Sequence, residues 1–388
     1  MDLTPKQLTE LIRTAFAPGV RDRCLGILVD LPDARVPDEA AWRETRGIAY
    51  EWYTMLHEQR DALGLSEVRL YAYGNVGSNN ADLPQELRML DEDPVPLAAG
   101  DLGSRGRGIG LSQALGETQI LLAPTLFSTT APLKLLARKI PFRAATMPGF
   151  TRAFLPSLGV DYGQVHAKVS ALAERLEKAE GATVVFSVGE ERHRLELDLR
   201  FRHGHASSGL MREPGQVGNL PSGEAYIAPY EGECEGEASL TAGILPVQFG
   251  TEVVLYEVSG NRARRVLSKG PESEKEAAHL EREPAYGNIA ELGLGILGEF
   301  GIQPVGATLL DEKLGLHVAF GRSDHFGGVT SPAKFTSPSE VVHIDWVYVP
   351  SLQPRIVPEE VVLTYESRQE CVMVKGRYLE LGIFPFRI

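Results

Sequence analysis

Five side chains in the second half of the sequence have the chemistry of divalent-metal ligands. His343 and Asp345 stand two residues apart in the run VVHIDWVY. Because successive side chains of a β-strand point to opposite faces of the sheet, an H-x-D pair on a strand places an imidazole and a carboxylate on one face. The other three lie upstream, Glu224 in NLPSGEAYIAP, Glu291 in GNIAELGLGIL and His317 in DEKLGLHVAFG.

The apolar surroundings of these residues favour a metal site. A carboxylate within an apolar run costs free energy unless it is paired or bound to a cation. Each residue taken alone also has a structural interpretation. Glu224 could be a solvent-facing strand residue after a turn, Glu291 an acidic residue at the start of a helix, and His317 a hydrogen-bonded core histidine.

Length and composition indicate the kind of chain that must position these groups. A chain of 388 residues with 43% hydrophobic and 23% charged residues fits two globular domains. Acidic residues outnumber basic ones, 52 against 39, and the formal net charge is -13. We therefore expect neither a nucleic acid nor an anionic membrane surface as a partner.

The cysteines and the N-terminal sequence predict a cytoplasmic location. The three cysteines are odd in number and far apart, so neither a disulfide framework nor a Cys-x-x-Cys metal site is indicated. The N-terminal run MDLTPKQLTELIRTAF has the pattern of a helix and lacks the apolar core of a signal peptide.

The two halves of the chain differ in their predicted secondary structure. Strand-like and helical segments alternate in the first half, which predicts parallel strands with crossover helices. Short strand-like runs separated by glycine- and proline-containing turns dominate the second half. We predict an α/β fold in which an N-terminal α/β domain with parallel strands, residues 1–145, precedes a β-rich α+β metal-binding domain, residues 146–388.

Several motifs resemble those of a known enzyme family in both order and spacing. The runs ATMPGFT, NLPSGEAYIAP, NIAELGLG, DEKLGLHVAFG and HIDWVY extend from about Ala144 to Tyr348 and resemble the thermophilic aminopeptidase (aminopeptidase T type) metallopeptidases. The resemblance implies a hydrolase that cleaves the N-terminal bond of a short peptide or a related small amide with a metal-activated water. It also implies a homodimer.

The resemblance further assigns roles to the five residues. It implies that a pair of divalent ions, zinc or cobalt, is bound by a set of three carboxylates and two imidazoles. It also implies that one of the two glutamates moves a proton during catalysis. The ligands carried over in this way are Glu224, Glu291, His317, His343 and Asp345.

One part of the family pattern is missing from this chain. In the peptidases a tyrosine that follows the first ligand histidine takes part at the metal site, whereas this chain reads HVAFGRSDHFGG there. We take Asp324 and His325, in that stretch, as candidate ligands or proton carriers that replace the tyrosine.

Two other functions stay open. The sequence is also similar to the iron(II) ring-cleaving 2,5-dihydroxypyridine 5,6-dioxygenases, in which the resemblance implies one iron held by Glu291, His343 and Asp345. A non-catalytic binding protein on the same fold is the third alternative.

Two further polar segments receive structural interpretations. We expect His203 and His205 to lie in a solvated loop. We expect the acidic run from Glu231 to Glu237, which contains two glycines, to form an exposed turn.

Overall fold

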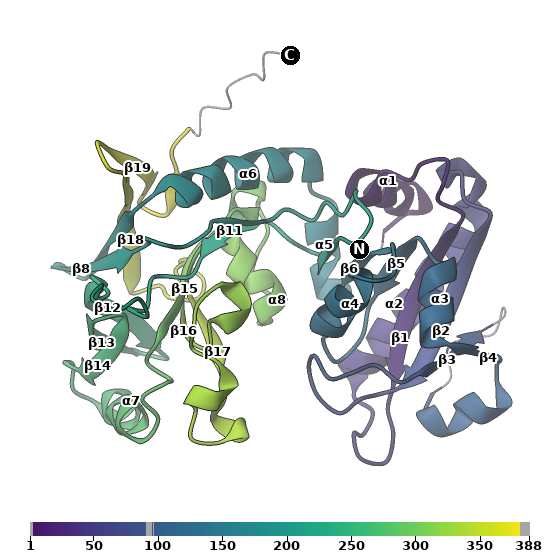
Figure 1. Cartoon of the computed structure of the whole chain (residues 1–388), viewed down its shortest axis with the longest axis horizontal. Helices are drawn as coiled ribbons and strands as arrows, with labels where there is room; N and C mark the ends of the chain where they lie inside the picture. Colours follow the sequence, from purple (N-terminus) through teal and green to yellow (C-terminus); the bar gives the residue numbers. More distant parts are fainter. Residues whose placement is uncertain (1–2, 91–94, 96, 381–388) are drawn as a thin grey trace. The chain divides into compact units, whose positions relative to one another are not determined.

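The computed structural model describes residues 3–90, 95 and 97–380, and the chain forms two compact units (Figure 1). Unit 1 comprises residues 1–164 and 209–222, and unit 2 comprises residues 165–208 and 223–388. We predicted a single division after residue 145. The structure divides differently, because the strand β10 (Val217–Asn219) returns to unit 1 and pairs in parallel with β6 (Arg143–Thr146).

Unit 1 is a sheet with helices, as the alternating pattern predicts. Its parallel strands β1, β2, β5, β6 and β10 form one continuous part of the sheet, and β3 and β4 add an antiparallel edge. The strand order is β10-β6-β5-β1-β2-β3-β4. The remaining elements are β1 (Cys24–Leu31), β2 (Glu67–Gly74), β3 (Glu86–Leu90), β4 (Arg107–Gly110), β5 (Ile120–Ala123), α1 (Pro5–Phe16), α2 (Ala40–Gln59), α3 (Leu111–Glu117), α4 (Thr130–Ala137) and α5 (Leu155–Leu158).

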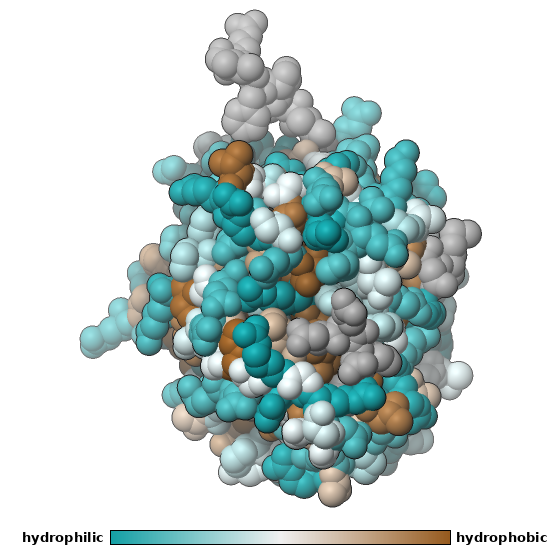
Figure 2. Space-filling model, turned by 90° about the vertical axis from the view of Figure 1, so that its right-hand side faces the viewer, coloured by the Kyte–Doolittle hydropathy of each residue, from teal (hydrophilic) through white to brown (hydrophobic). Residues whose placement is uncertain are grey.

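Hydrophilic side chains cover most of the face of unit 1 that Figure 2 shows. Large exposed hydrophobic side chains in this unit, such as Val20, Leu97 and Leu135, stand at separate positions in the sequence. Among the described residues, no helix has the length and apolar character needed to cross a membrane.

Unit 2 contains two antiparallel sheets. The larger has the order β14-β13-β12-β8-β7-β18-β19-β20, and the smaller has the order β17-β16-β15-β11-β9. The first comprises β7 (Gly181–Val188), β8 (Glu191–Asp198), β12 (Ala242–Phe249), β13 (Glu252–Ser259), β14 (Arg262–Val266), β18 (Ile356–Thr364), β19 (Gln369–Val374) and β20 (Arg377–Tyr378). The second comprises β9 (His205–Ser207), β11 (Glu224–Ile227), β15 (Ile289–Gly295), β16 (Leu316–Gly321) and β17 (His343–Val347).

The helices α6 (Tyr162–Lys178), α7 (Pro271–Arg282) and α8 (Thr308–Asp311) complete the regular structure of the second half. The prediction of an α/β fold with a β-rich second part is therefore confirmed. Both sheets of unit 2 are purely antiparallel, which the sequence left undecided.

One face of the smaller sheet packs against the larger sheet through aromatic side chains. The rings of Phe320 on β16 and Tyr256 on β13 have centroids 5.1 Å apart. Trp346 on β17 and Phe249 on β12 make a second such contact, also at 5.1 Å. Because side chains alternate along a strand, the residues between these aromatic positions point to the opposite face. That opposite face carries the predicted ligands.

Candidate metal centre

Strand register brings all five predicted ligands to one face of the smaller sheet. Residues directly opposite each other in an antiparallel pair share a face. His317 lies opposite Val347, which is on the same face as Asp345 and His343, two and four residues away. Gly293 on β15 lies opposite His317 on one neighbouring strand and opposite Tyr226 on the other, so all three residues share this face. Glu291 is two residues before Gly293 and Glu224 is two residues before Tyr226, so both glutamates lie on the same face.

Within this face the ligands form two groups that share one carboxylate. The first group contains Glu224, Glu291 and His317, and the second contains Glu291, His343 and Asp345. In each group the potential ligand atoms lie within 4.8 Å of one another. Glu291 Oε1 is 3.3 Å from His317 Nε2, and its Oε2 is 3.3 Å from His343 Nε2. Glu291 therefore faces both groups, one oxygen to each.

Backbone carbonyls orient the two imidazoles. His343 Nδ1 lies 2.9 Å from the carbonyl oxygen of Arg322, and His317 Nδ1 lies 3.3 Å from that of Gly315. A proton on each Nδ1 can donate to the carbonyl, so that Nε2 of each ring faces the carboxylates. This arrangement is the usual support of a metal-binding histidine.

Small residues on the same face make room for the ligand side chains. A Cβ atom at Gly293 would overlap the imidazole of His317, and one at Gly295 would overlap the backbone of Lys313. Ala319 and Gly321 stand opposite Asp345 and His343 on the neighbouring strand. The run ELGLG thus alternates leucines that face the core with glycines that leave space at the site.

Opposite charges in the cluster shift the pKa values of its members. Burial alone would raise the pKa of Glu291, but the imidazoles of His317 and His343 hold that pKa well below its usual range. Burial opposes protonation of His317, yet Glu291, Asp345 and Glu224 raise its pKa to about 9. In the same way, Asp345 and Glu291 raise the pKa of His343. Glu291 therefore stays ionised and attracts positive charge.

Several carboxylate oxygens of the cluster are buried without a hydrogen-bond partner. They are Glu224 Oε2 and both carboxylate oxygens of Asp345, whose side chain is 2% exposed. A buried carboxylate oxygen without a hydrogen bond is costly, and a cation at these oxygens would remove the cost. Three carboxylates and two imidazoles suit zinc, cobalt, manganese or iron(II). The residues present therefore fit a divalent-metal centre.

A buried lysine that we did not predict as a site residue also belongs to this cluster. Lys313, in the 3₁₀ turn η5 (Glu312–Leu314), has a side chain that is 1% exposed. Its Nζ donates a hydrogen bond of 2.6 Å to Glu224 Oε1 and a second one to Glu312. Glu224 thus has one oxygen on the lysine and the other, Oε2, 3.6 Å from His317 Nε2.

The two residues expected to replace the family tyrosine lie beside the cluster, outside both ligand groups. Asp324, in the 3₁₀ turn η6 (Asp324–Phe326), accepts a hydrogen bond from Arg322 Nε at 2.5 Å. The ring of His325 lies 5.4 Å from the ring of His343. Partial burial, helped by the charges of His343 and Arg322, lowers the pKa of His325 to about 4, so its imidazole is neutral near pH 7.

Aromatic side chains lie next to the ligands on the same face. Tyr226 stacks on His205, with centroids 5.1 Å apart, and meets Phe326 edge-on at 5.1 Å. Phe326 also contacts the ring of His343, with centroids 5.1 Å apart.

We expected His203 and His205 to lie in a solvated loop. This prediction was wrong for His205, which belongs to β9, but the side chain of His203 is largely exposed. Tyr226 could have been found from the sequence, because it follows Glu224 by two residues on a strand.

The expectation of an exposed turn at Glu231–Glu237 was wrong for its first residue. Glu231 accepts hydrogen bonds from Ser323 Oγ at 2.5 Å, Val329 N at 2.9 Å and Thr330 Oγ1 at 2.5 Å. The loop it holds contains Arg322, whose carbonyl orients His343. Nothing in a Gly- and Glu-rich sequence indicates this long-range contact.

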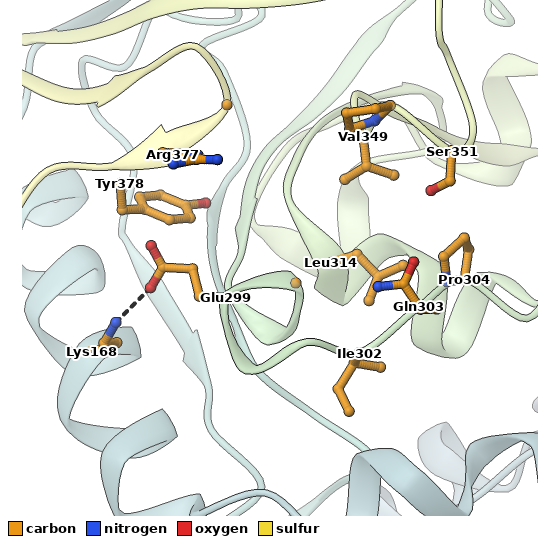
Figure 3. A pocket seen from close by; sticks show the side chains of 13 residues that line it. Lys168, Glu299, Ile302, Gln303, Pro304, Leu314, Val349, Ser351, Arg377 and Tyr378 are labelled. Atoms are coloured by element: carbon orange, nitrogen blue, oxygen red, sulfur yellow. Dashed lines mark hydrogen bonds and ion pairs between the residues drawn. The ribbon is translucent and has the colours of Figure 1, made fainter.

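Unit 2 contains two cavities, a smaller one that is lined in part by a predicted ligand and a larger one that is lined by none of them. The first has a volume of about 290 Å³ and is lined in part by Asp345, Trp346 and Gln353. The second, of about 570 Å³, is the pocket drawn in Figure 3, where the Lys168–Glu299 ion pair and Tyr378 face Val349 and other residues. None of the five predicted ligands lines this second pocket. Of the five predicted ligands, Asp345 lines the smaller cavity.

Comparisons with known proteins show similarity at the level of the fold. The sequence matches no family model, and no curated protein is similar enough to count as a match. Two solved structures are similar along nearly the whole chain. They are a 2,5-dihydroxypyridine dioxygenase from Pseudomonas putida KT2440 (TM-score 0.60, 14% identity, 98% of this chain and 99% of that chain) and wild-type AmpT from Thermus thermophilus (TM-score 0.52, 14% identity, 97% and 98%). This chain therefore shares its fold with both proteins.

A substitution at Gly293 tests whether the glycine shapes the ligand cluster. Gly293→Ala should remove most of the divalent metal that the protein takes up, because the added Cβ displaces the His317 ring. Metal analysis after loading and dialysis measures the effect, and far-UV circular dichroism checks the fold. Gly47→Ala is the matched control, since a Cβ at Gly47 meets nothing within 4 Å. Unchanged metal content in the Gly293 variant would show that His317 is not needed.

A substitution at Glu231 tests the loop that supports His343. Glu231→Ala should lower the free energy of unfolding by about 2 kcal/mol, since hydrogen bonds to a charged group contribute roughly 1.5–3 kcal/mol each and water partly replaces them. Urea denaturation measures this change. Glu235→Ala, at an exposed position of the same turn, is the control. Equal midpoints for the two variants would contradict the supporting role.

Proposed function

We propose that this chain is a metal-dependent hydrolase that cleaves a peptide bond or a related amide bond. The observation that carries the proposal is the position of Glu291, whose two oxygens each face a different histidine at 3.3 Å. A carboxylate shared in this way suits a pair of divalent ions, which we take to be zinc or cobalt. Glu224 and His317 would hold one ion, His343 and Asp345 the other, and Glu291 both.

The bound ions would supply a nucleophilic water near neutral pH and polarise the substrate carbonyl. The side chains of the chain itself would orient the substrate and move protons. Burial and the nearby carboxylates of Glu291 and Glu224 raise the pKa of Tyr226, so its hydroxyl stays protonated and can donate a hydrogen bond. The neutral imidazole of His325 can accept a proton beside His343.

The site also limits the kind of partner that we propose. A cavity of about 290 Å³ beside Asp345 fits a small molecule or the end of a short peptide better than a folded protein. The homodimer and the cytoplasmic location remain predictions from the sequence.

Removal of a ligand tests this function directly. His343→Ala should lower the hydrolysis of aminoacyl anilides by at least about a hundredfold, the upper end of what the loss of a supporting group costs at a metal site. His203→Ala is the control, because that side chain is 82% exposed and pairs with Glu177. Assays with zinc or cobalt, before and after chelation, measure the activity. Full activity in chelated protein or in the His343 variant would contradict the proposal, and metal binding without turnover would favour a binding protein.

The second candidate function is an iron(II) ring-cleaving dioxygenase with one ion. The ion pair between Lys313 and Glu224 favours it, because Glu224 already has a cationic partner. Glu291, His343 and Asp345 would then form a complete set of three ligands, with positions left for oxygen and substrate. His205, Tyr226 and Phe326 would offer aromatic surfaces to a planar ring.

Anaerobic loading with iron(II) separates the two candidates. The hydrolase predicts no oxygen consumption when dihydroxypyridines are added to the iron-loaded protein, because its site activates water. The dioxygenase predicts oxygen uptake in proportion to the substrate consumed, with one iron per chain. An oxygen electrode and iron analysis give the answer, and oxygen uptake would replace the first proposal by the second.

A further inference from the structure

Lys313 lies at one end of the ligand cluster. Its ammonium group is buried and donates to two partners among the described residues, Glu224 and Glu312. Glu224 belongs to the first ligand group but not to the second. The positive charge of Lys313 therefore acts mainly on one of the two groups.

The fold fixes the lysine at this end. Gly295 lies opposite Glu224 in the pairing of β15 with β11. The backbone of Lys313 packs directly against Gly295, where a Cβ atom would collide with it. A glycine in the sheet thus lets the η5 turn lie on the ligand face, with the ammonium beside Glu224.

Lys313 lies between two carboxylates, of which only one belongs to the ligand groups. Its Nζ lies 2.6 Å from Glu224 Oε1 and also donates to Glu312. Glu224 is a member of the first ligand group, whereas Glu312 is a member of neither. A cation bound at the first group would therefore lie close to the ammonium, because both would contact Glu224.

The two groups are otherwise matched in ligand type. Each offers two carboxylates and one imidazole, with Glu291 in common. In the first group, Lys313 already neutralises part of the charge of Glu224 and would repel a cation bound there. The second group has no such neighbour among the residues that hydrogen-bond to its carboxylates.

We propose that Lys313 makes the two ion positions unequal, with tight binding at Glu291, His343 and Asp345 and weak binding at Glu224, Glu291 and His317. This inference rests on the proposed metal centre and deepens it. Lys313 is then a positioning residue that sets the affinity of the weak position. A purely structural ion pair would anchor η5 without changing the relative affinities of the two positions.

A cobalt titration of the metal-free protein tests the inference. Wild-type protein should bind one Co²⁺ tightly and a second one at least about tenfold more weakly, as expected for a unit charge a few ångströms from the second ion. Lys313→Met should tighten the weak position and bring the two dissociation constants to within a few fold. Calorimetry and the visible spectrum of bound cobalt measure both steps.

Three further variants keep the result interpretable. Lys313→Arg keeps the charge and should keep the inequality, and Glu224→Gln should abolish the weak step while leaving the tight one. Lys168→Met removes another ion-paired lysine of unit 2, the partner of Glu299, and should leave both steps unchanged. If Lys313→Met does not fold, the wild-type affinities and the Glu224→Gln result still decide the order of the two positions.

The outcomes separate this inference from the proposed function. Equal affinities in the wild type, or an unchanged weak step in a folded Lys313→Met variant, would overturn the role of Lys313 even if the protein hydrolyses amides. Two unequal steps that Lys313→Met brings closer together, without any hydrolysis, would support the role of Lys313 and contradict the hydrolase.

Discussion

The burial of three carboxylates on one face of a small sheet is the constraint on which the rest of unit 2 depends. Glu224, Glu291 and Asp345 have almost no contact with solvent, so their negative charge must be balanced inside the protein. Two imidazoles and one lysine ammonium provide this balance in part. The unpartnered oxygens of Glu224 and Asp345 show where further positive charge would be stabilised. A divalent ion at these oxygens would complete the balance.

One face of the smaller sheet packs against the larger sheet, and the other face carries the candidate metal ligands. The aromatic contacts of Phe320 and Trp346 with the larger sheet give the strands a rigid apolar backing. The opposite face carries glycine and alanine where the ligand side chains need space. Carbonyls from Gly315 and Arg322 then fix the ring nitrogens. Glu231, far away in sequence, holds the loop that supplies one of these carbonyls.

Local alternation explains which parts of this centre could be predicted. The H-x-D spacing places His343 and Asp345 on one face, and the structure brings them together with the three upstream residues. The same rule applied to Glu224 would have identified Tyr226. Lys313 and Glu231 could not be found in this way, because their contacts depend on the pairing of β11 with β15 and on the course of a distant loop. The return of β10 to unit 1 was likewise a matter of long-range pairing.

The central claim is that Glu291 lies between two divalent ions on this face. Anomalous X-ray diffraction from crystals soaked in zinc tests it most directly, because it locates the ions without any assumption about substrate. We predict two anomalous peaks, one contacting Glu224, Glu291 and His317 and the other contacting Glu291, His343 and Asp345. Fewer than two peaks within bonding distance of Glu291 in zinc-soaked crystals would contradict the account.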